Sequence, residues 1–171
     1  MLIQKLAGAK LFSRKIPWRK KMTNDDYQRL LEINNDPEVK KEMPGHYKDV
    51  AEVCQWINDN NVYAIRDNNN QVVGFVQLYE LNKSLKKRLN NVEALEISFA
   101  LPSKFRTQAG MVSNAVRQVC AQNPNTKIVG FAHPDNFKSI RVLERCGFVY
   151  SGKVKYHGND KFDNLVYTKK V

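Results

Sequence analysis

The chain has 171 residues, of which 42% are hydrophobic and 26% charged, with a formal net charge of +11 at pH 7. This length suits one domain that buries about 70% of its unfolded surface, so no disulfide staple is required. No apolar run reaches the roughly 20 residues of a membrane-spanning helix. The three cysteines are widely spaced and odd in number, which favours buried thiols in a cytoplasmic protein over a disulfide or a zinc site.

The excess of positive charge favours an acidic partner, such as nucleic acid, the ribosome, an acidic protein or a polyphosphate cofactor. The charge is densest in two clusters, Arg14–Lys21 and Lys83–Arg88. Solvated surface is the simpler interpretation of either cluster taken alone. Trp18 adds one aromatic residue to the first cluster, which is too little to argue for nucleic-acid recognition.

The first third of the chain carries one strand pattern and then helix patterns. Residues 10–17 are expected to form a first strand, preceded by an N-terminal extension of residues 1–9. Thr23-Asn24-Asp25-Asp26 has the spacing of a capping box. Asp36-Pro37 restarts a helix as its cap and first residue. The apolar spacing over residues 50–57 predicts a further helix.

Strands are expected in the middle of the chain. Residues 62–66 and 71–81 form a hairpin across a polar turn, with Gly74 at a bulge. A basic loop over residues 82–91 leads to a strand over residues 94–101. In that strand one face carries Leu95, Ile97, Phe99 and Leu101, and the other carries Ala94, Glu96, Ser98 and Ala100.

The last third alternates between helix and strand. Its pattern predicts a helix over residues 109–122, a strand over 127–132, a helix over 136–146 and strands over 149–156 and 163–169. The crossover around residues 94–132 implies locally parallel strands. The expected fold is therefore α/β (α+β), with a mixed, mostly antiparallel central sheet of about six to seven strands flanked by helices.

The helix that begins near residue 136 carries the most informative motif. Asn136 and Ser139 lie in its first turn, a buried stripe follows, and Gly147-Phe148 ends it. This Asn-x-x-Ser helix with its terminal Gly-Phe resembles the C-terminal half of the GNAT superfamily, the acyl-CoA-dependent N-acetyltransferases. The amino-acid sequence of this motif is most similar to that of the branch that acetylates ribosomal-protein N-termini and related amines. An ordinary α/β helix that ends in glycine is the alternative.

The resemblance implies a single GNAT-like domain over residues 10–171 that uses acetyl-CoA and no metal. An acetyl group would pass by direct transfer to a primary amine, which is a protein N-terminus, a lysine or a small amine. The backbone of Phe99, Ala100 and Leu101 would line a slot for pantetheine between two splayed strands and could stabilise an oxyanion. The pyrophosphate would lie on a turn made of Arg106, Thr107, Gln108, Ala109, Gly110 and Met111.

That turn departs from the family pattern, because Thr107 and Ala109 stand where glycines are usual. An alanine there costs little if its backbone is right-handed and more if φ must be positive. Arg106 would add a charge-assisted contact to phosphate, or it is an ordinary surface arginine.

The resemblance also suggests chemical roles. Glu96 would be the general base, with a pKa raised by partial burial; alternatively, it is a surface glutamate paired with a lysine or arginine. Many family members carry a tyrosine at the position of Leu143. Ser139 would instead assist the leaving thiolate, or its hydroxyl is satisfied by the helix backbone. Asn136 would contact the pantetheine amide, cap the helix, or do both.

A second function stays open at this point. A catalytically inactive module of the same fold would recognise an acidic partner or RNA, as the glycine-poor turn, the missing tyrosine and the charge of +11 suggest. An enzyme that uses a longer acyl-CoA is a third option. The histidines lack metal-ligand spacing. The acceptor and the oligomeric state cannot be read from the sequence.

Overall fold

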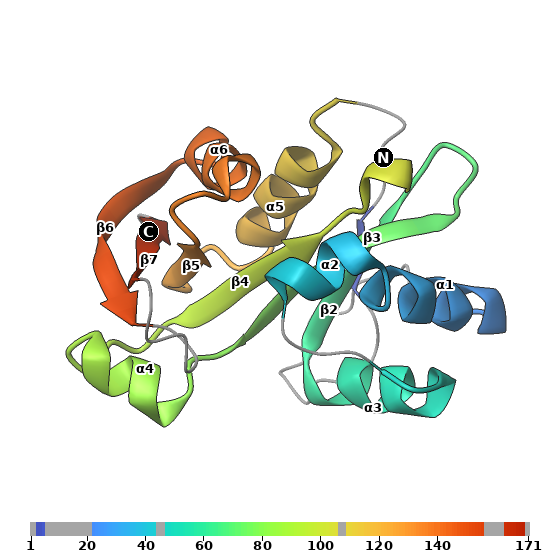
Figure 1. The fold of residues 1–171 in the computed structure, drawn as a ribbon, viewed down its shortest axis with the longest axis horizontal. Coiled ribbons are helices and arrows are strands. Elements are labelled where there is room, and N and C mark those ends of the chain that lie inside the picture. Colours follow the sequence, from blue (N-terminus) through green and yellow to red (C-terminus); the bar gives the residue numbers. More distant parts are fainter. Residues whose placement is uncertain (1–2, 6–21, 44–46, 106–108, 156–162, 170–171) are drawn as a thin grey trace. The chain divides into compact units, whose positions relative to one another are not determined.

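The computed structural model in Figure 1 describes residues 3–5, 22–43, 47–105, 109–155 and 163–169. Its contacts divide the chain into two compact units. Unit 1 comprises Met1–Gln77 and Phe99–Ala115, and unit 2 comprises Leu78–Ser98 and Val116–Val171. The division passes through three elements, β3 (Val72–Glu80), β4 (Leu95–Ala100) and α5 (Met111–Ala121), so each of them contributes residues to both units.

Unit 1 begins with strand and helix elements whose ends are set by their own side chains. They are β1 (Ile3–Lys5), α1 (Asn24–Asn34), α2 (Pro37–Glu42), α3 (Val50–Asp59) and β2 (Asn61–Arg66). The predicted capping box is confirmed, because the Thr23 and Asp26 side chains each accept from the other's backbone N–H. Asp36 caps α2 as predicted, with Pro37 as its first residue.

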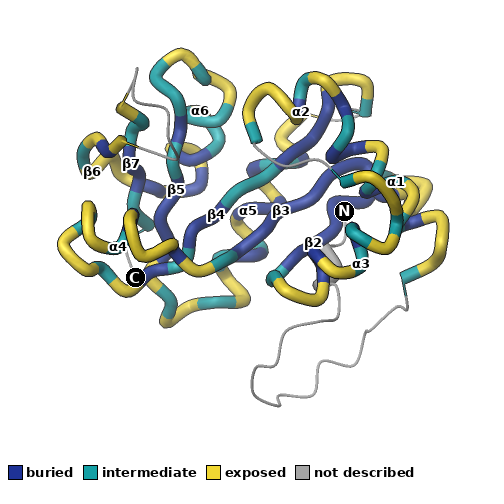
Figure 2. Tube along the Cα trace, turned by 60° about the horizontal axis from the view of Figure 1, so that its bottom comes forward, coloured by how far each residue is buried: buried dark blue, intermediate teal, exposed yellow. Residues whose placement is uncertain are grey.

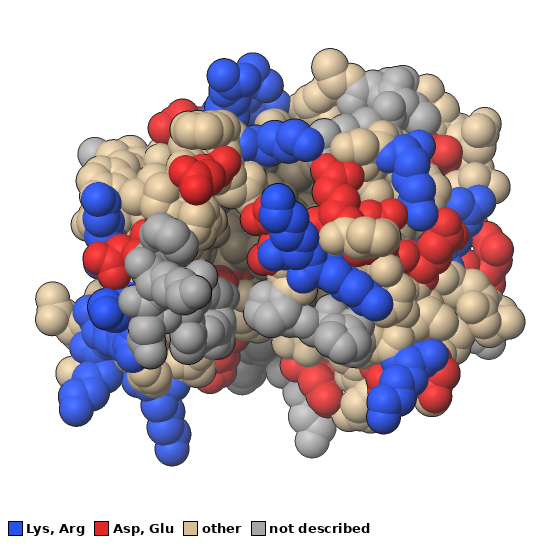
Figure 3. Space-filling model, in the orientation of Figure 1, with Lys and Arg blue, Asp and Glu red and all other residues tan. Residues whose placement is uncertain are grey.

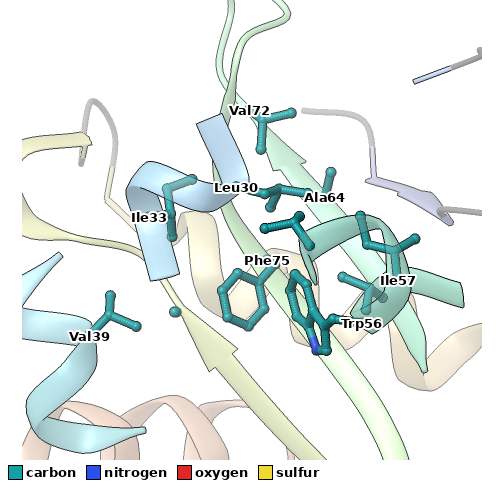
Figure 4. Close-up of a cluster of buried hydrophobic side chains, with 11 residues drawn as sticks. Leu30, Ile33, Val39, Trp56, Ile57, Ala64, Val72 and Phe75 are labelled. Carbon is teal, nitrogen blue, oxygen red and sulfur yellow. The ribbon is translucent and has the colours of Figure 1, made fainter. Parts of the chain in front are cut away.

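The core of unit 1 lies between the helices and β2, β3 and the end of β4 (Figure 4). Trp56 of α3 stands edge-on to Phe75 of β3, with ring centroids 5.0 Å apart, and Tyr47 stacks on Trp56 at 5.4 Å. Such aromatic pairs add to the stabilisation that comes from buried area. The buried side chains of this core are Leu30, Ile33, Val39, Val53, Trp56, Ile57, Val62, Ala64, Val72, Phe75 and Ala100.

Unit 2 contains α4 (Lys83–Arg88), β5 (Ile128–Ala132), α6 (Phe137–Arg145), β6 (Phe148–Lys155) and β7 (Asp163–Lys169). Val129 belongs to a buried cluster with Leu85 of α4. Gly130, the next residue, faces Leu143 of α6 instead. Since successive side chains of a strand point to opposite faces, α4 and α6 cover opposite faces of β5.

The strands hydrogen-bond in the order β1-β2-β3-β4-β5-β7-β6, which makes seven strands in the described part of the chain. The β1/β2, β5/β7 and β6/β7 pairs are antiparallel and the β4/β5 pair is parallel. The predicted mixed, mostly antiparallel sheet of six to seven strands flanked by helices is confirmed, as is the parallel pair at the crossover. Figure 2 shows the central strands buried along most of their length.

The prediction of a basic loop over residues 82–91 is wrong, since this segment contains the helix α4. The Asn82 side chain accepts from the backbone N–H of Leu85 and so caps the helix. Leu85 anchors it in the apolar cluster with 2% of its surface exposed. Basic residues in the last turn are favoured by the helix dipole. One cap and one buried leucine therefore suffice for a short helix.

Two further expectations concern positions in strands. The predicted strand over residues 10–17 lies outside the described residues, whereas Ile3–Lys5, in the stretch assigned to an N-terminal extension, pairs with β2. At Gly74 the backbones of β3 and β4 lie close together, because a Cβ on this residue would be 2.5 Å from the carbonyl oxygen of Ala100. Only a glycine lets the two backbones come so near.

Candidate active site

Glu96 lies in β4 with its side chain buried on the face opposite α6. Its register partner on β5 is Val129, which faces the α4 side. Only 3% of Glu96 is exposed. The interpretation of Glu96 as a surface residue is therefore wrong, because a surface glutamate would keep most of its area in water.

The Tyr79 hydroxyl donates a hydrogen bond to Oε1 of Glu96 over 2.5 Å. Tyr79 is half-buried near the end of β3. The sequence motifs did not identify this tyrosine. Its signal was modest: a polar-tipped aromatic residue two positions after the buried Gln77, in a strand that is otherwise mostly apolar.

The parallel ladder between β4 and β5 is short. It registers Leu95–Ile97 with Ile128–Gly130, whereas both strands continue beyond these pairs. On its other edge, β5 stays in register with β7 over its whole length. Pairing between β4 and β5 therefore ends next to Glu96, before Ser98 is reached.

Ser98 follows Glu96 on the same face of β4. Its Oγ atom is buried and has no hydrogen-bond partner among the residues that the structure describes. A buried hydroxyl without a partner is costly and calls for an explanation such as a bound group. A polar atom in this state, at the end of the ladder, fits a ligand that brings its own hydrogen-bonding groups.

The start of α6 combines Asn136 and Ser139, as the motif predicted. Asn136 Oδ1 accepts from the backbone N–H of Ser139 at 3.1 Å, so Asn136 is an N-cap. Both side chains are half-buried. A Cβ on Gly130 would meet Leu143 at 2.7 Å, which explains why the helix can lie so close to β5. Because α6 covers the face opposite Glu96, the two predicted catalytic residues approach the sheet from different sides.

The predicted phosphate turn is described only in its second half. Arg106, Thr107 and Gln108 lie outside the described residues. Gly110 has φ +79°, and Ala109 is not among the residues with positive φ. Gly110 therefore occupies the described position of the turn whose backbone is left-handed. Ala109 occupies a position without positive φ, where an alanine side chain causes little strain. The alanine at position 109 is therefore compatible with the backbone of the turn, although family members usually carry a glycine there.

Gly110 also forms the entrance to α5, because its carbonyl oxygen accepts from the N–H of Asn114 at 2.9 Å. Ala109 and Gly110 are exposed, while Met111 is buried with 3% of its surface exposed. A Cβ on Gly110 would find no atom within 4 Å among the described residues. The open space beside a helix N-terminus suits an anion such as phosphate.

The segment that leads into this turn is held by acidic residues of unit 1. Glu38 of α2 accepts from the backbone N–H and the hydroxyl of Ser103, at 2.7 and 2.9 Å. Lys104 forms ion pairs with Glu32 at 3.2 Å and Asp36 at 3.0 Å. These contacts fix residues 103–105 relative to α1 and α2, although exposed ion pairs add little to stability.

Phe99, Ala100 and Leu101 complete the residues predicted for cofactor binding. Ala100 and Leu101 are buried, whereas Phe99 is half-buried. The carbonyl oxygen of Ala100 lies against Gly74, and the Leu101 side chain lies near the same glycine. The backbone here is thus shaped by contact with β3 inside unit 1.

Charge is distributed unevenly between the units. In the described part of unit 1, Asp and Glu outnumber Lys and Arg, whereas in that of unit 2 Lys and Arg predominate. Figure 3 shows acidic and basic side chains intermixed over α1 and α2, and mainly basic side chains over α4. Unit 2 is therefore the part whose described residues carry the excess of positive charge.

The described residues hold neither a membrane span nor a metal cluster. No helix in this part of the chain is long and apolar enough to cross a membrane. Within the same residues, no group of three His, Cys, Asp or Glu side chains is placed to hold a metal ion. His46 and His157 lie outside the described residues, and His133 lies 3.7 Å from the Asp135 carboxylate.

Comparison with known proteins gives one family and several related folds. The family model described as "Acetyltransferase (GNAT) domain" matches residues 20–149. No curated protein matches the chain. Among solved structures, a GNAT-family acetyltransferase from Bacillus anthracis is 21% identical, with a TM-score of 0.64, and the match covers 84% of this chain and 87% of that chain.

Two other structures share the fold. Ribosomal-protein-S5-alanine acetyltransferase from Vibrio fischeri is 18% identical, with a TM-score of 0.65 and coverage of 86% of this chain and 89% of that one. AAC(6')-Ib in complex with Parmomycin and AcetylCoA is 19% identical, with a TM-score of 0.61 and coverage of 86% and 89%. Identities this low bear on the fold alone.

Proposed function

Because the chain belongs to the GNAT acetyltransferase family and is therefore an N-acetyltransferase, we propose that it transfers the acetyl group of acetyl-CoA directly to a primary amine. One observation carries the mechanism. Glu96 is a buried carboxylate beside the point where the β4/β5 ladder ends. A buried base at an interrupted ladder can meet a substrate that enters between the strands.

The described residues fit the CoA thioester. The Ser98 hydroxyl lacks a partner among them at the end of the ladder, and none of their atoms lies within 4 Å of a Cβ placed on Gly110. Phe99, Ala100 and Leu101 would hold the pantetheine arm through their backbone groups. The turn from Arg106 to Met111 would hold the pyrophosphate. The thioester supplies the activated acetyl carbon, and the protein supplies position and proton transfer.

Glu96 acts as the general base. It takes the proton of the acceptor amine, directly or through a water molecule, as the nitrogen attacks the acetyl carbon. Ser139 and Asn136 belong to the opposite face of the sheet, where α6 lies. Ser139 would donate a hydrogen bond to the departing sulfur, and Asn136 would contact the pantetheine amide in addition to capping α6.

The acceptor belongs to one of three classes: a protein N-terminus, a lysine side chain or a small amine. Fold neighbours include enzymes named for a ribosomal-protein alanine and for spermidine, so both peptide and small amines should be tested. None of the three cysteines, all of them described, forms a disulfide, which fits a reducing cytoplasm. The basic surface of unit 2 fits an acidic protein or the ribosome.

The test is an acyl-CoA panel combined with amine and peptide libraries, with release of the free CoA thiol as the signal. We expect thiol release that depends on an amine, with acetyl-CoA preferred over longer acyl-CoAs. Calorimetry with acetyl-CoA should show micromolar binding. Absence of both binding and thiol release over the whole panel would refute the proposal.

A further inference from the structure

The Glu96 carboxylate is bonded to a neutral phenol. The Tyr79 hydroxyl donates to Oε1 over 2.5 Å, which lies at the short end of the range for O–H···O⁻ bonds. Glu96 is 3% exposed and Tyr79 is half-buried. A bond in such a place is screened little by water, so it has a strong influence on the carboxylate.

Tyr79 is also well anchored. It belongs to β3 and lies in unit 2 together with Glu96. A tyrosine ring has only two side-chain torsions, so a phenol holds its partner with less loss of conformational freedom than a lysine would. Glutamate, by contrast, can rotate about three torsions. The hydrogen bond therefore restricts the more mobile of the two groups.

Several described neighbours of this pair are uncharged. Ser98 follows Glu96 on the same face of β4, and Val129 is the register partner of Glu96 on β5. Charged groups on described neighbouring elements include Glu80 at the end of β3 and the pair made by Lys86 of α4 with Glu93, 2.9 Å apart. Lys86 is thus engaged by Glu93 and also interacts with Glu80.

We propose that Tyr79 is a positioning residue that keeps the Glu96 carboxylate ionised and oriented toward the acceptor amine. This inference rests on the proposed function. In that reaction the amine nitrogen bonds to the acetyl carbon, its proton passes to Glu96, and the C–S bond breaks with its electron pair going to the CoA sulfur. Tyr79 keeps its own proton throughout, so its effect is exerted through Glu96.

The first test is Tyr79→Phe, which removes the hydroxyl and retains the ring. We expect kcat to fall about 10- to 100-fold, the range for a lost hydrogen bond to a charged group, with KM for acetyl-CoA unchanged. Losing a donor to the ionised form raises the pKa of a carboxylate. The acid limb of the kcat profile should therefore move to higher pH by roughly one unit. Tyr150→Phe, at a residue 51% exposed on β6, is the matched control and should match the wild type.

A double-mutant cycle separates positioning from packing. If Tyr79 acts through Glu96, then Tyr79→Phe should have no further effect on kcat in a Glu96→Gln background. A residue that only supports the fold would lower activity by the same factor in both backgrounds. Thermal melts of all variants check that each protein is folded.

The outcomes separate a failure of the proposed function from a failure of the role of Tyr79. If the wild type transfers no acetyl group to any amine, the proposed function and this inference both fall. If the wild type is active and Tyr79→Phe matches it in kcat and pH profile, only the role of Tyr79 is overturned. That role is also overturned if the losses from Tyr79→Phe and Glu96→Gln simply multiply in the double mutant.

Discussion

Two buried carboxylates, one in each unit, have opposite kinds of partner. Asp26 of unit 1 is 6% exposed and receives two hydrogen bonds from the Arg66 guanidinium, at 2.7 and 3.0 Å. Its Oδ2 also accepts from the backbone N–H of Thr23. Glu96 of unit 2 is 3% exposed and is bonded to the neutral hydroxyl of Tyr79.

The difference separates a structural role from a chemical one. Burial alone would raise the pKa of Asp26, but hydrogen bonds from Arg66 and Thr23 outweigh it and hold the pKa below its ordinary value of 3.8. A carboxylate paired in this way is a weak base. Glu96 accepts a hydrogen bond from a phenol, which carries no positive charge, and in the proposed mechanism it is the base.

The largest expected effect is the loss of activity in Glu96→Gln. Removing a general base costs about 10²- to 10⁴-fold in rate, or roughly 3 to 5 kcal/mol in the barrier. The glutamine keeps the shape and can still accept from Tyr79, so the melting temperature should stay near that of the wild type. Steady-state kinetics with thiol detection, alongside thermal melts, measures both quantities. Unchanged turnover would remove Glu96 from the mechanism.

The comparison is strengthened by removing the cation beside Asp26. Arg66→Met leaves a buried carboxylate without its cation, and it also removes a hydrogen bond to the carbonyl oxygen of Asn70. Breaking a buried pair in this way should lower the free energy of unfolding by about 3 to 5 kcal/mol. Urea denaturation measures this loss.

The double variant Asp26→Asn with Arg66→Met serves as the control. It removes the unpaired charge, so it should recover part of the stability that Arg66→Met loses. If Arg66→Met were as stable as the wild type, Asp26 would not depend on its cation and the contrast with Glu96 would fail.

The capping role of Asp26 in unit 1 could be foreseen from the sequence, whereas its bond to Arg66 could not. Thr23 and Asp26 are three residues apart, and this spacing alone specifies a capping box. Arg66 lies 40 residues further along the chain. The Asp26 and Arg66 side chains meet only because α1 and β2 pack together in the fold. The positions of the two residues in the sequence do not predict this contact.

The candidate site divides in the same way. The alternation in β4 places Glu96 and Ser98 on one face, and the helix motif places Asn136 at a cap; both follow from local periodicity. The bond from Tyr79, the end of the β4/β5 ladder and the approach of Ala100 to Gly74 depend on register between strands. The largely polar composition of residues 82–91 gave no sign of the helix α4, whose one buried side chain is that of Leu85.

The stability of the protein should depend on the protonation of Asp26 in acid. Its folded pKa lies below the unfolded one, so its contribution is complete above about pH 4. That contribution is lost as the pH falls through the folded pKa. Urea unfolding between pH 7 and pH 3 should therefore show a smaller acid-induced loss of stability for Asp26→Asn than for the wild type. Equal pH dependence in the two proteins would contradict the assignment.

The smallest expected effect concerns Thr23, which is the second hydrogen-bonding partner of Asp26. The Thr23 hydroxyl accepts from the backbone N–H of Asp26 at 3.2 Å and closes the capping box of α1. Thr23→Ala should lower the free energy of unfolding by about 1 kcal/mol, whereas Thr23→Ser, which keeps the hydroxyl, should be close to the wild type. Neither change should alter kcat, because the cap supports a helix of unit 1, whereas Tyr79 and Glu96 belong to unit 2. A loss of turnover in Thr23→Ala at full folding would show that the structural and the chemical carboxylate are coupled.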